Sequence, residues 1–191
     1  PQRIEESSDQ SGGLLLEYGL TYRDAERLLA TLPNVEAVIP VKVSPIDLWV
    51  RHQKLTVQLV ATVPWIAESQ SIRLEDPSRM RFITQLDLDN RANVIVISDK
   101  VARSLFLYED PIGKSLKVGA DVYRVVGVTR SAGPTAGGAS GVELASQSAD
   151  AYVPITTLRA REGDLVIRRD QGAMSAEKVE LSELILQLKP D

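Results

Sequence analysis

An unbroken apolar run, Val94–Ile97, constrains the fold more than any other feature of the sequence. Four β-branched residues in succession, with no polar residue between them, are typical of a strand that is buried on both faces. Ser98 or Asp99 can cap a short helix directly afterwards, which we predict at Lys100–Leu107. This order of elements indicates a mixed domain with an aliphatic core, because only 5% of the residues are aromatic.

A tight turn and a hairpin are predicted after this helix. Asp110-Pro111-Ile112-Gly113 has turn chemistry, in which Pro fixes the chain direction and Gly113 can adopt a positive φ without steric penalty. Ser115–Val118 and Tyr123–Thr129 are predicted to pair with each other. Gly127, inside the second of these strands, leaves room for the close approach of another backbone or side chain. We interpret these as folding residues rather than catalytic ones.

Further elements are predicted on both sides of this segment. They are a helix from Thr21 to Leu32, strands at Val35–Val43, Leu48–Val50, Leu55–Ala61, Ala151–Val153 and Leu181–Leu188, a short helix near Trp65–Ser69, and a helical turn at Thr156 or Thr157. Pro40 indicates an edge or a bulge in its strand. The polar residues 51–54 are predicted to form a turn, residues 133–141 a flexible loop and residues 171–175 a polar break.

Composition and charge exclude several classes of function. The net charge is −4, and no basic stripe with interleaved aromatic residues is present, so nucleic-acid binding is not expected. The absence of Cys excludes disulfides, thiolate catalysis and Cys-based zinc sites. No apolar run approaches the roughly 20 residues that cross a bilayer. The chain begins with Pro1 rather than Met, which fits a piece of a longer protein and equally a processed mature chain or a trimmed tag.

Three polar motifs resemble sites for chemistry, and each has a simpler interpretation. His52 is the only His and lies in a predicted turn, so we expect it to be exposed there. The segment 87–90, Asp-Leu-Asp-Asn, lacks the Gly and the later bidentate Glu of a calcium loop, and we predict a plain loop. Gly113-Lys114-Ser115 mimics the end of a phosphate-binding loop, but Tyr108 replaces the first Gly and the helix precedes the strand.

Four aromatic side chains are candidates either for the core or for a partner interface. They are Trp49, Trp65, Phe82 and Phe106. Large aromatic residues dominate the energetics of both environments, and core filling is the more common outcome. We keep Trp49 and Trp65 as candidate interface residues.

Three short motifs follow the buried strand in a fixed order. They are Leu105-Phe106 at the predicted helix end, Asp110-Pro111-Ile112-Gly113-Lys114 at the turn, and Val125-Val126-Gly127-Val128 in the last strand. This segment resembles the MacB-like periplasmic core domain of permeases in the MacB, LolC/LolE and FtsX superfamily. The segments 81–84 and 152–154 agree in order and spacing, so the likeness covers roughly residues 20–159. Met80 and Ser98 stand where the family usually has Gly.

The resemblance implies an α+β fold with two nested lobes. A βαβ-type, porter-like outer lobe is expected at residues 14–61 and 152–188, and an inserted, mixed, strand-rich lobe at residues 62–151. Residues 1–13, which are polar and acidic, are expected to form a flexible lead-in. The residues that the resemblance marks as a structural motif are Leu105, Phe106, Asp110, Pro111, Gly113, Lys114, Gly127 and Pro154.

The same resemblance implies a function. The domain would lie on the periplasmic, extracytoplasmic side of the bacterial cytoplasmic membrane. It would pass ATP-driven motion of the permease's own membrane helices to cargo or partner proteins, in efflux, lipoprotein release or peptide transport. Expected partners are those helices, a cytoplasmic ATPase (fused or separate) that binds the ATP, a second permease protomer, and a periplasmic adaptor or cargo. No cofactor, metal or enzymatic activity is expected in the domain itself.

Two other interpretations remain open at this point. The chain could be a free-standing periplasmic ligand-binding or sensor module, which a deep apolar pocket with convergent polar groups would favour. It could also be a hydrolase that uses Asp87, Asp89 or a Ser. A compact cleft that brings two titratable groups together would distinguish an enzyme from a binding or mechanical module.

Overall fold

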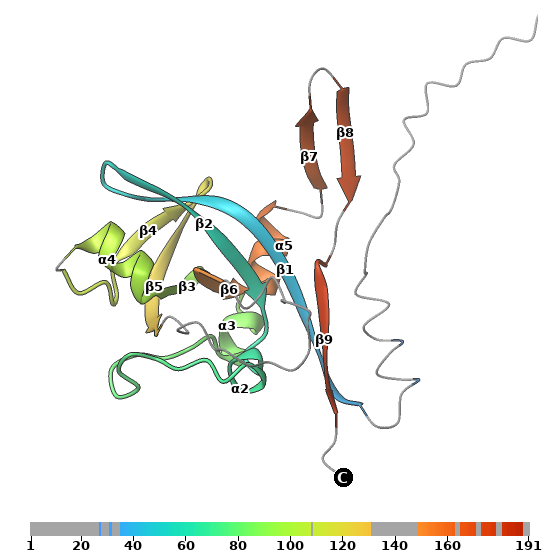
Figure 1. The fold of residues 1–191 in the computed structure, drawn as a ribbon, viewed down its shortest axis with the longest axis horizontal. Coiled ribbons are helices and arrows are strands. Elements are labelled where there is room, and N and C mark those ends of the chain that lie inside the picture. Colours follow the sequence, from blue (N-terminus) through green and yellow to red (C-terminus); the bar gives the residue numbers. More distant parts are fainter. Residues whose placement is uncertain are drawn as a thin grey trace, which may run out of the picture.

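The computed structural model describes residues 27, 31, 35–107, 109–130, 149–162, 165–170, 173–178 and 181–188 of the 191-residue chain. The elements within them are β1 (Val35–Val50), β2 (Gln53–Thr62), α2 (Ile66–Ser69), α3 (Gln85–Asp89), β3 (Val94–Ser98), α4 (Asp99–Phe106), β4 (Ser115–Val118), β5 (Asp121–Thr129), β6 (Ala151–Pro154), α5 (Ile155–Glu162), β7 (Leu165–Asp170), β8 (Ala173–Lys178) and β9 (Glu183–Leu188). This is a mixed α+β domain, rich in strands and with few helices, as the α+β prediction required (Figure 1).

Six strands form one closed sheet in the order β2-β6-β3-β5-β4-β1, and β1 pairs again with β2. The pairs β2–β6 and β3–β5 are parallel, and the other neighbours are antiparallel. Closure of a sheet removes its exposed edges, so these strands offer few sites for unwanted pairing. We call this six-stranded unit the closed sheet. β9 lies outside it and pairs with β1, while β7 and β8 form a separate hairpin.

The buried run predicted from the sequence forms β3, which lies between β6 and β5 in the closed sheet. Every residue of β3 is buried, and Ile95, Val96 and Ile97 have no exposed surface. α4 connects β3 to the hairpin, and its first turn is capped by Ser98, whose hydroxyl accepts a hydrogen bond from the Val101 amide at 3.3 Å. The strand, the cap and the β4–β5 hairpin are therefore confirmed.

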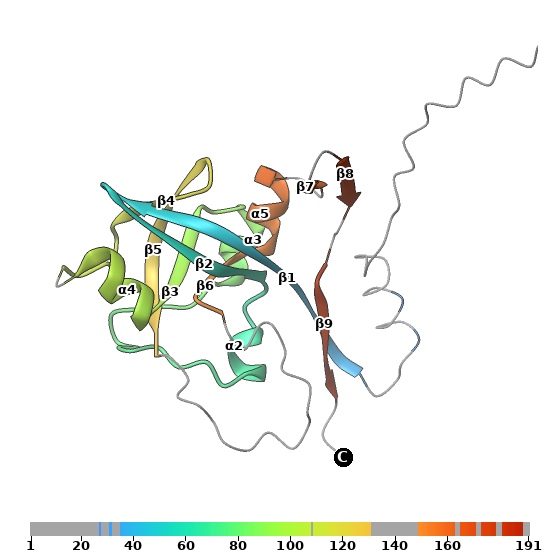
Figure 2. The same ribbon diagram turned by 45° about the horizontal axis from the view of Figure 1, so that its top comes forward.

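The N-terminal strand is longer than predicted. The two strands expected at 35–43 and 48–50 are one strand, β1, in which residues 35–41 pair with β9 and residues 42–50 pair with β2 (Figures 1 and 2). Pairing with β2 holds the chain extended through Ser44 and Pro45, which interrupt the apolar pattern in the sequence. Pro40 lies in the part of β1 that pairs with β9 alone, as the edge alternative predicted, since pairing with β2 begins at Lys42. The register shift with β9 lies between Val35 and Ala37 rather than at Pro40.

Three further local predictions need correction. The segment 87–90, expected as a plain loop, belongs mostly to α3, which a capping box between Thr84 and Asp87 initiates. The polar turn expected at 51–54 consists of Arg51 and His52 only, since β2 begins at Gln53. The polar break expected at 171–175 overlaps β8, the second strand of a hairpin that the sequence did not predict. The lead-in, the loop at 133–141 and most of the helix expected at 21–32 lie outside the described residues.

The division into two lobes stays a prediction. β2 and β6, which the predicted boundaries assign to the outer lobe, pair with each other and with β1 and β3 in the closed sheet. Buried residues from these strands and from β3, β4 and β5 belong to one hydrophobic core. Within the described ranges, no helix is long and apolar enough to span a membrane.

Candidate functional site

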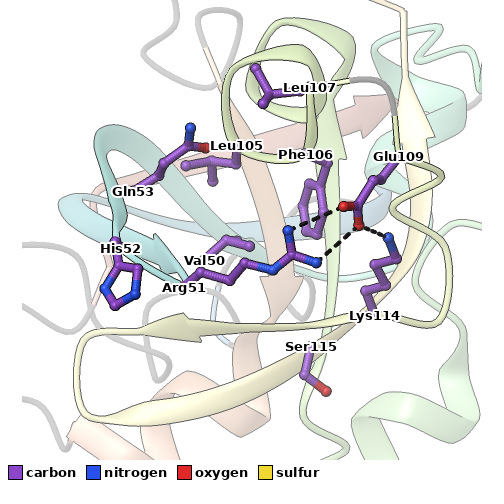
Figure 3. A pocket seen from close by; sticks show the side chains of 10 residues that line it. All are labelled: Val50, Arg51, His52, Gln53, Leu105, Phe106, Leu107, Glu109, Lys114 and Ser115. Atoms are coloured by element: carbon purple, nitrogen blue, oxygen red, sulfur yellow. Dashed lines mark hydrogen bonds and ion pairs between the residues drawn. The ribbon is translucent and has the colours of Figure 1, made fainter.

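A cleft of about 570 Å³ opens at one end of the closed sheet (Figure 3). The β1–β2 turn forms one wall, and the end of α4 with the following loop forms the other. Apolar side chains line its floor, among them Val50, Leu105 and Phe106, while Arg51 and Lys114 stand at its rim. Leu105 and Phe106 are buried, because α4 packs its apolar face against the sheet.

Two cations share one carboxylate at this rim. The Arg51 guanidinium donates to both carboxylate oxygens of Glu109, at 3.1 and 3.3 Å, and the Lys114 ammonium donates to Oε2 of the same group (Figure 3). These hydrogen bonds, from Lys114 first and then from Arg51, hold the pKa of Glu109 below its ordinary value. All three side chains are substantially exposed, so the arrangement can be rearranged at little cost.

The turn after α4 is fixed by Asp110. Its Oδ1 accepts from the Ile112 amide at 3.0 Å, and its Oδ2 accepts from Arg79 at 2.6 Å. The backbone bond to Ile112 and then the Arg79 bond keep the pKa of Asp110 below its ordinary value. Gly113 adopts a φ of +77°, and its amide donates to the Val125 carbonyl at 2.8 Å. The predicted turn residues thus position Lys114 beside Glu109, so that the two side chains form a direct ion pair.

A second cluster, which we call the interior cluster because its carboxylate is buried, fastens residues 81–87 beside β5. Arg81 donates to both oxygens of Asp87, at 2.6 and 3.0 Å, and Thr84 adds its amide and hydroxyl at 2.9 and 2.7 Å. Burial alone would raise the pKa of Asp87, but the hydrogen bonds from Arg81 and Thr84 outweigh it and lower the pKa. A Cβ on Gly127 would lie 2.3 Å from the Arg81 carbonyl oxygen. The backbone at Arg81 can therefore approach β5 this closely only because residue 127 is glycine.

The carboxylates of the hydrolase interpretation, Asp87 and Asp89, do not line the cleft, and the titratable groups that the cleft brings together, Glu109 and Lys114, form an exposed ion pair. Asp87 accepts hydrogen bonds from Arg81 and Thr84, and Asp89 accepts one from the Gln85 side-chain Nε2 at 2.8 Å. The two carboxylates are therefore held by separate partners rather than paired with each other. In the described part of the chain, no group of three or more His, Asp or Glu side chains could hold a metal ion.

The aromatic candidates divide into two pairs. Phe106 is buried, and Phe82 packs edge-on against Tyr152 with 5.4 Å between ring centroids, as core filling predicts. Trp49 and Trp65 are 39% and 38% exposed, so core filling is wrong for both. Trp49 precedes the β1–β2 turn and Trp65 follows β2, so the structure places them at opposite ends of that strand.

The remaining predicted residues occupy separate places. His52 is exposed in the β1–β2 turn, as expected, and borders the cleft. Pro154 is buried at the end of β6, where it pairs with Thr62. Arg51, Leu107 and Glu109 belong to the cleft and were not singled out from the sequence. Leu107 follows two inward-facing residues in the predicted helix, and nothing in the local pattern shows that the helix ends before it.

Comparison with known proteins places this geometry in a family. The profile of the MacB-like periplasmic core domain matches residues 2–190. The chain belongs to this family. This confirms the resemblance found in the motifs between Val94 and Thr129 and locates the domain on the periplasmic or extracellular side of a membrane ABC transporter.

Two relatives share part of the sequence. The macrolide export ATP-binding/permease protein MacB of Nitrosomonas europaea is 30% identical over 146 residues, which cover 74% of this chain. The macrolide export ATP-binding/permease protein MacB 2 of Aeromonas hydrophila is 26% identical over 142 residues, also 74% of this chain. The match spans only 20% of the length of either relative.

Two solved structures share the fold of the MacB-like domain. The periplasmic region of MacB from Actinobacillus actinomycetemcomitans superposes with a TM-score of 0.64 at 18% identity, over 88% of this chain and 65% of that one. The extracellular domain of the noncanonic ABC-type transporter YknZ from Gram-positive bacteria gives a TM-score of 0.63 at 19% identity, over 90% and 74% of the two chains.

Proposed function

We propose that this domain transmits ATP-driven motion of the permease's membrane helices to cargo or partner proteins outside the cytoplasm. The observation that carries the proposal is the continuity of β1, which pairs with β9 over its first half and forms part of the closed sheet over its second half. A strand that belongs to both parts moves them together, because its backbone hydrogen bonds cannot slide without breaking several at once. The division into an outer and an inserted lobe is part of this proposal.

A second connection runs through α5, which leads from β6 towards β7. The Thr156 hydroxyl donates to the Leu88 carbonyl at 2.7 Å, and the Thr157 hydroxyl donates to the Ala92 carbonyl at 3.0 Å. Both acceptors lie at or just after the end of α3, and each also accepts from a backbone amide, that of Arg91 for Leu88 and that of Val94 for Ala92. α5 is thereby attached at two points to α3 and to the segment that leads into β3, which supports motion as a unit.

The remaining parts of the proposal follow from the family. The membrane helices would precede and follow this domain in the parent protein, and ATP would bind in a cytoplasmic ATPase, fused or separate. The two sequence relatives are described as macrolide export proteins, which supports export as the class of transport. The domain itself would use no cofactor and form no bonds with its cargo, and a second permease protomer would provide the opposing surface.

Spin-label distances in the membrane-embedded parent would test the transmission. A single Cys in place of exposed Lys117, with any Cys elsewhere in the parent replaced, places one label on each protomer of the dimer. We expect the label–label distance to change between the nucleotide-free and ATP-trapped states. A Gly-Gly insertion after Ser44 should reduce that change, whereas the same insertion between Arg51 and His52 should leave it intact. Identical distances in both nucleotide states would refute transmission.

Because the insertion into β1 could cause misfolding, a milder variant provides a second test of transmission. Replacing Thr156 and Thr157 by Val removes both hydroxyl–carbonyl bonds while it keeps the side-chain shape. We expect a smaller nucleotide-dependent change in distance with an unfolding midpoint close to that of the wild type. In the parent gene, hydrophobic spans are expected before Pro1 and some tens of residues after Asp191, and their absence would contradict the permease assignment.

A further inference from the structure

Leu107 has a backbone conformation that is unfavourable for leucine. Its φ and ψ are +55° and −107°, and the turn is closed by the Glu109 amide, which donates to the Phe106 carbonyl at 2.9 Å. Glycine adopts positive φ without penalty, whereas the Cβ of an L-residue crowds its own backbone there. The Leu107 side chain is also 60% exposed, so burial in this domain does not compensate for the strain.

A second residue at the same cleft is held in the left-handed region. Arg51 has a φ of +54°, and its guanidinium reaches across the cleft to Glu109 (Figure 3). Ser71 and Arg91, away from the cleft, also have a positive φ, and at Arg51 it belongs to the two-residue turn between β1 and β2. Glycine at 107 would relieve both the strain and the apolar exposure. A leucine there indicates that its side chain has a contact outside this chain.

The charge around Leu107 is complementary to an acidic partner. Arg51 and Lys114 share the carboxylate of Glu109, and Arg79 pairs with the adjacent Asp110, so three cations face two carboxylates. Lys54 pairs with Asp47, and exposed Lys117 lies opposite Trp49 in the neighbouring strands. This end of the closed sheet is therefore positive, although the chain as a whole carries a net charge of −4.

The direction of β1 argues for a protein partner rather than a lipid surface. Its first residues pair with β9, and its last residues lead into the β1–β2 turn at the opposite end of the strand (Figures 1 and 2). This turn forms one wall of the cleft. Sixteen extended residues span up to about 50 Å, so the cleft lies far from β9. If the chain ends lead to membrane helices, as the proposed function states, then the cleft is directed away from the membrane.

We propose that the tip surface, defined as Val50, Arg51, Phe106, Leu107, Glu109 and Lys114, docks an acidic segment of a partner protein. An apolar side chain of that segment packs against Leu107 and Phe106, and its carboxylate takes the place of Glu109 between Arg51 and Lys114. In the free domain, Glu109 itself occupies the position between Arg51 and Lys114. Its ion pairs with them are exposed and therefore weak enough to be exchanged for those of a partner carboxylate. The orientation of this surface rests on the proposed function, whereas its chemistry does not.

Binding of a defined peptide to the intact chain would test the docking surface. The probe is a 12-residue peptide that alternates Leu and Glu, and its control carries Gln in place of every Glu. In low salt, we expect the acidic probe to shift the amide resonances of Leu107, Glu109 and Lys114, and the control to shift them much less. Glu109→Gln, which removes the internal competitor, should tighten binding about two- to fivefold.

Leu107→Gly separates docking from folding because its two effects have opposite signs. It should weaken peptide binding about tenfold or more, since an apolar contact is lost. It should also raise the unfolding midpoint by about 2–4 °C, since relief of the strained φ outweighs the added freedom of the unfolded chain. Leu86, which is 68% exposed on α3, provides the matched control. Leu86→Gly should lower the midpoint and leave peptide binding unchanged.

Several outcomes would overturn the docking surface. They are unchanged peptide binding by Leu107→Gly, a lower midpoint for that variant, no resonance shift at millimolar peptide, stronger binding to phosphatidylglycerol vesicles than to the peptide, and self-association of the chain through these residues in sedimentation. None of them bears on distances measured in the membrane-embedded parent. The docking surface and the proposed transmission therefore fail separately.

Discussion

The domain contains two clusters in which an arginine holds a carboxylate with two hydrogen bonds, and they differ in burial. In the interior cluster, the Asp87 side chain is 8% exposed and Thr84 completes its shell of donors. At the tip surface, the Glu109 side chain is 45% exposed and Arg51 is 74% exposed. The Arg81 side chain is itself 42% exposed, so the two clusters differ mainly in the burial of the carboxylate. The comparison teaches that the same pair of groups fastens the fold where the carboxylate is buried and remains exchangeable where the carboxylate is exposed.

Each cluster also has a glycine beside it, and the two glycines differ in the space around them. Gly127 faces the Arg81 carbonyl, whereas a Cβ on Gly113 would meet nothing within 4 Å. We expect Gly127→Ala to lower the free energy of unfolding by about 3 kcal/mol or more, since a buried backbone has to move. Gly113→Ala should cost only about 1 kcal/mol, from its positive φ alone. Urea unfolding of both variants measures the difference. Equal losses of unfolding free energy would contradict the close packing of Gly127 against the Arg81 carbonyl.

Removal of the charge from each carboxylate should give the next largest difference. Asp87→Asn leaves donors of Arg81 and Thr84 without a charged acceptor, and we expect a loss of about 2 kcal/mol in unfolding free energy. Glu109→Gln removes only exposed ion pairs and should leave the unfolding midpoint unchanged within error. Thermal unfolding of the two variants in the same buffer checks this. A loss for Glu109→Gln as large as that for Asp87→Asn would contradict the distinction between the clusters.

The smallest expected effect is the loss of stability in acid, where protonation of Asp87 weakens the interior cluster. The folded pKa of Asp87 lies below its ordinary value of 3.8, so its stabilisation is present above that pH and is lost as pH falls through the folded pKa. We expect the free energy of unfolding to fall below about pH 4, with a shallower fall for Asp87→Asn. Urea unfolding between pH 5 and about pH 2 measures both profiles. Parallel profiles would show that Asp87 contributes little to the acid sensitivity.

Local features were predictable where the deciding contacts lie within a few residues. The apolar run of β3, the Ser98 cap and the turn at Asp110 all follow from neighbouring residues. α3 could also have been found, because Thr84 and Asp87 have the spacing of a capping box.

The candidate site could not be predicted in the same way. Arg51 and Glu109 are separated by 58 positions, so no local pattern links them. The strain at Leu107 depends on where α4 ends, and helix ends are poorly determined by periodicity. The exposure of Trp49 depends on which face of β1 the closed sheet turns inward, because alternate residues of a strand face opposite sides.

The sequence by itself determined the family, the α+β class and the local elements between Val94 and Thr129. Those results depend on capping, turn geometry and short-range periodicity, which act over a few bonds. Only the tertiary structure decided that β1 is one strand and that β2 closes the sheet against β6, some 90 residues later. The physical reason is that strand pairing and burial depend on partners that are distant in sequence. The residues of one strand do not specify which other strand will pair with it.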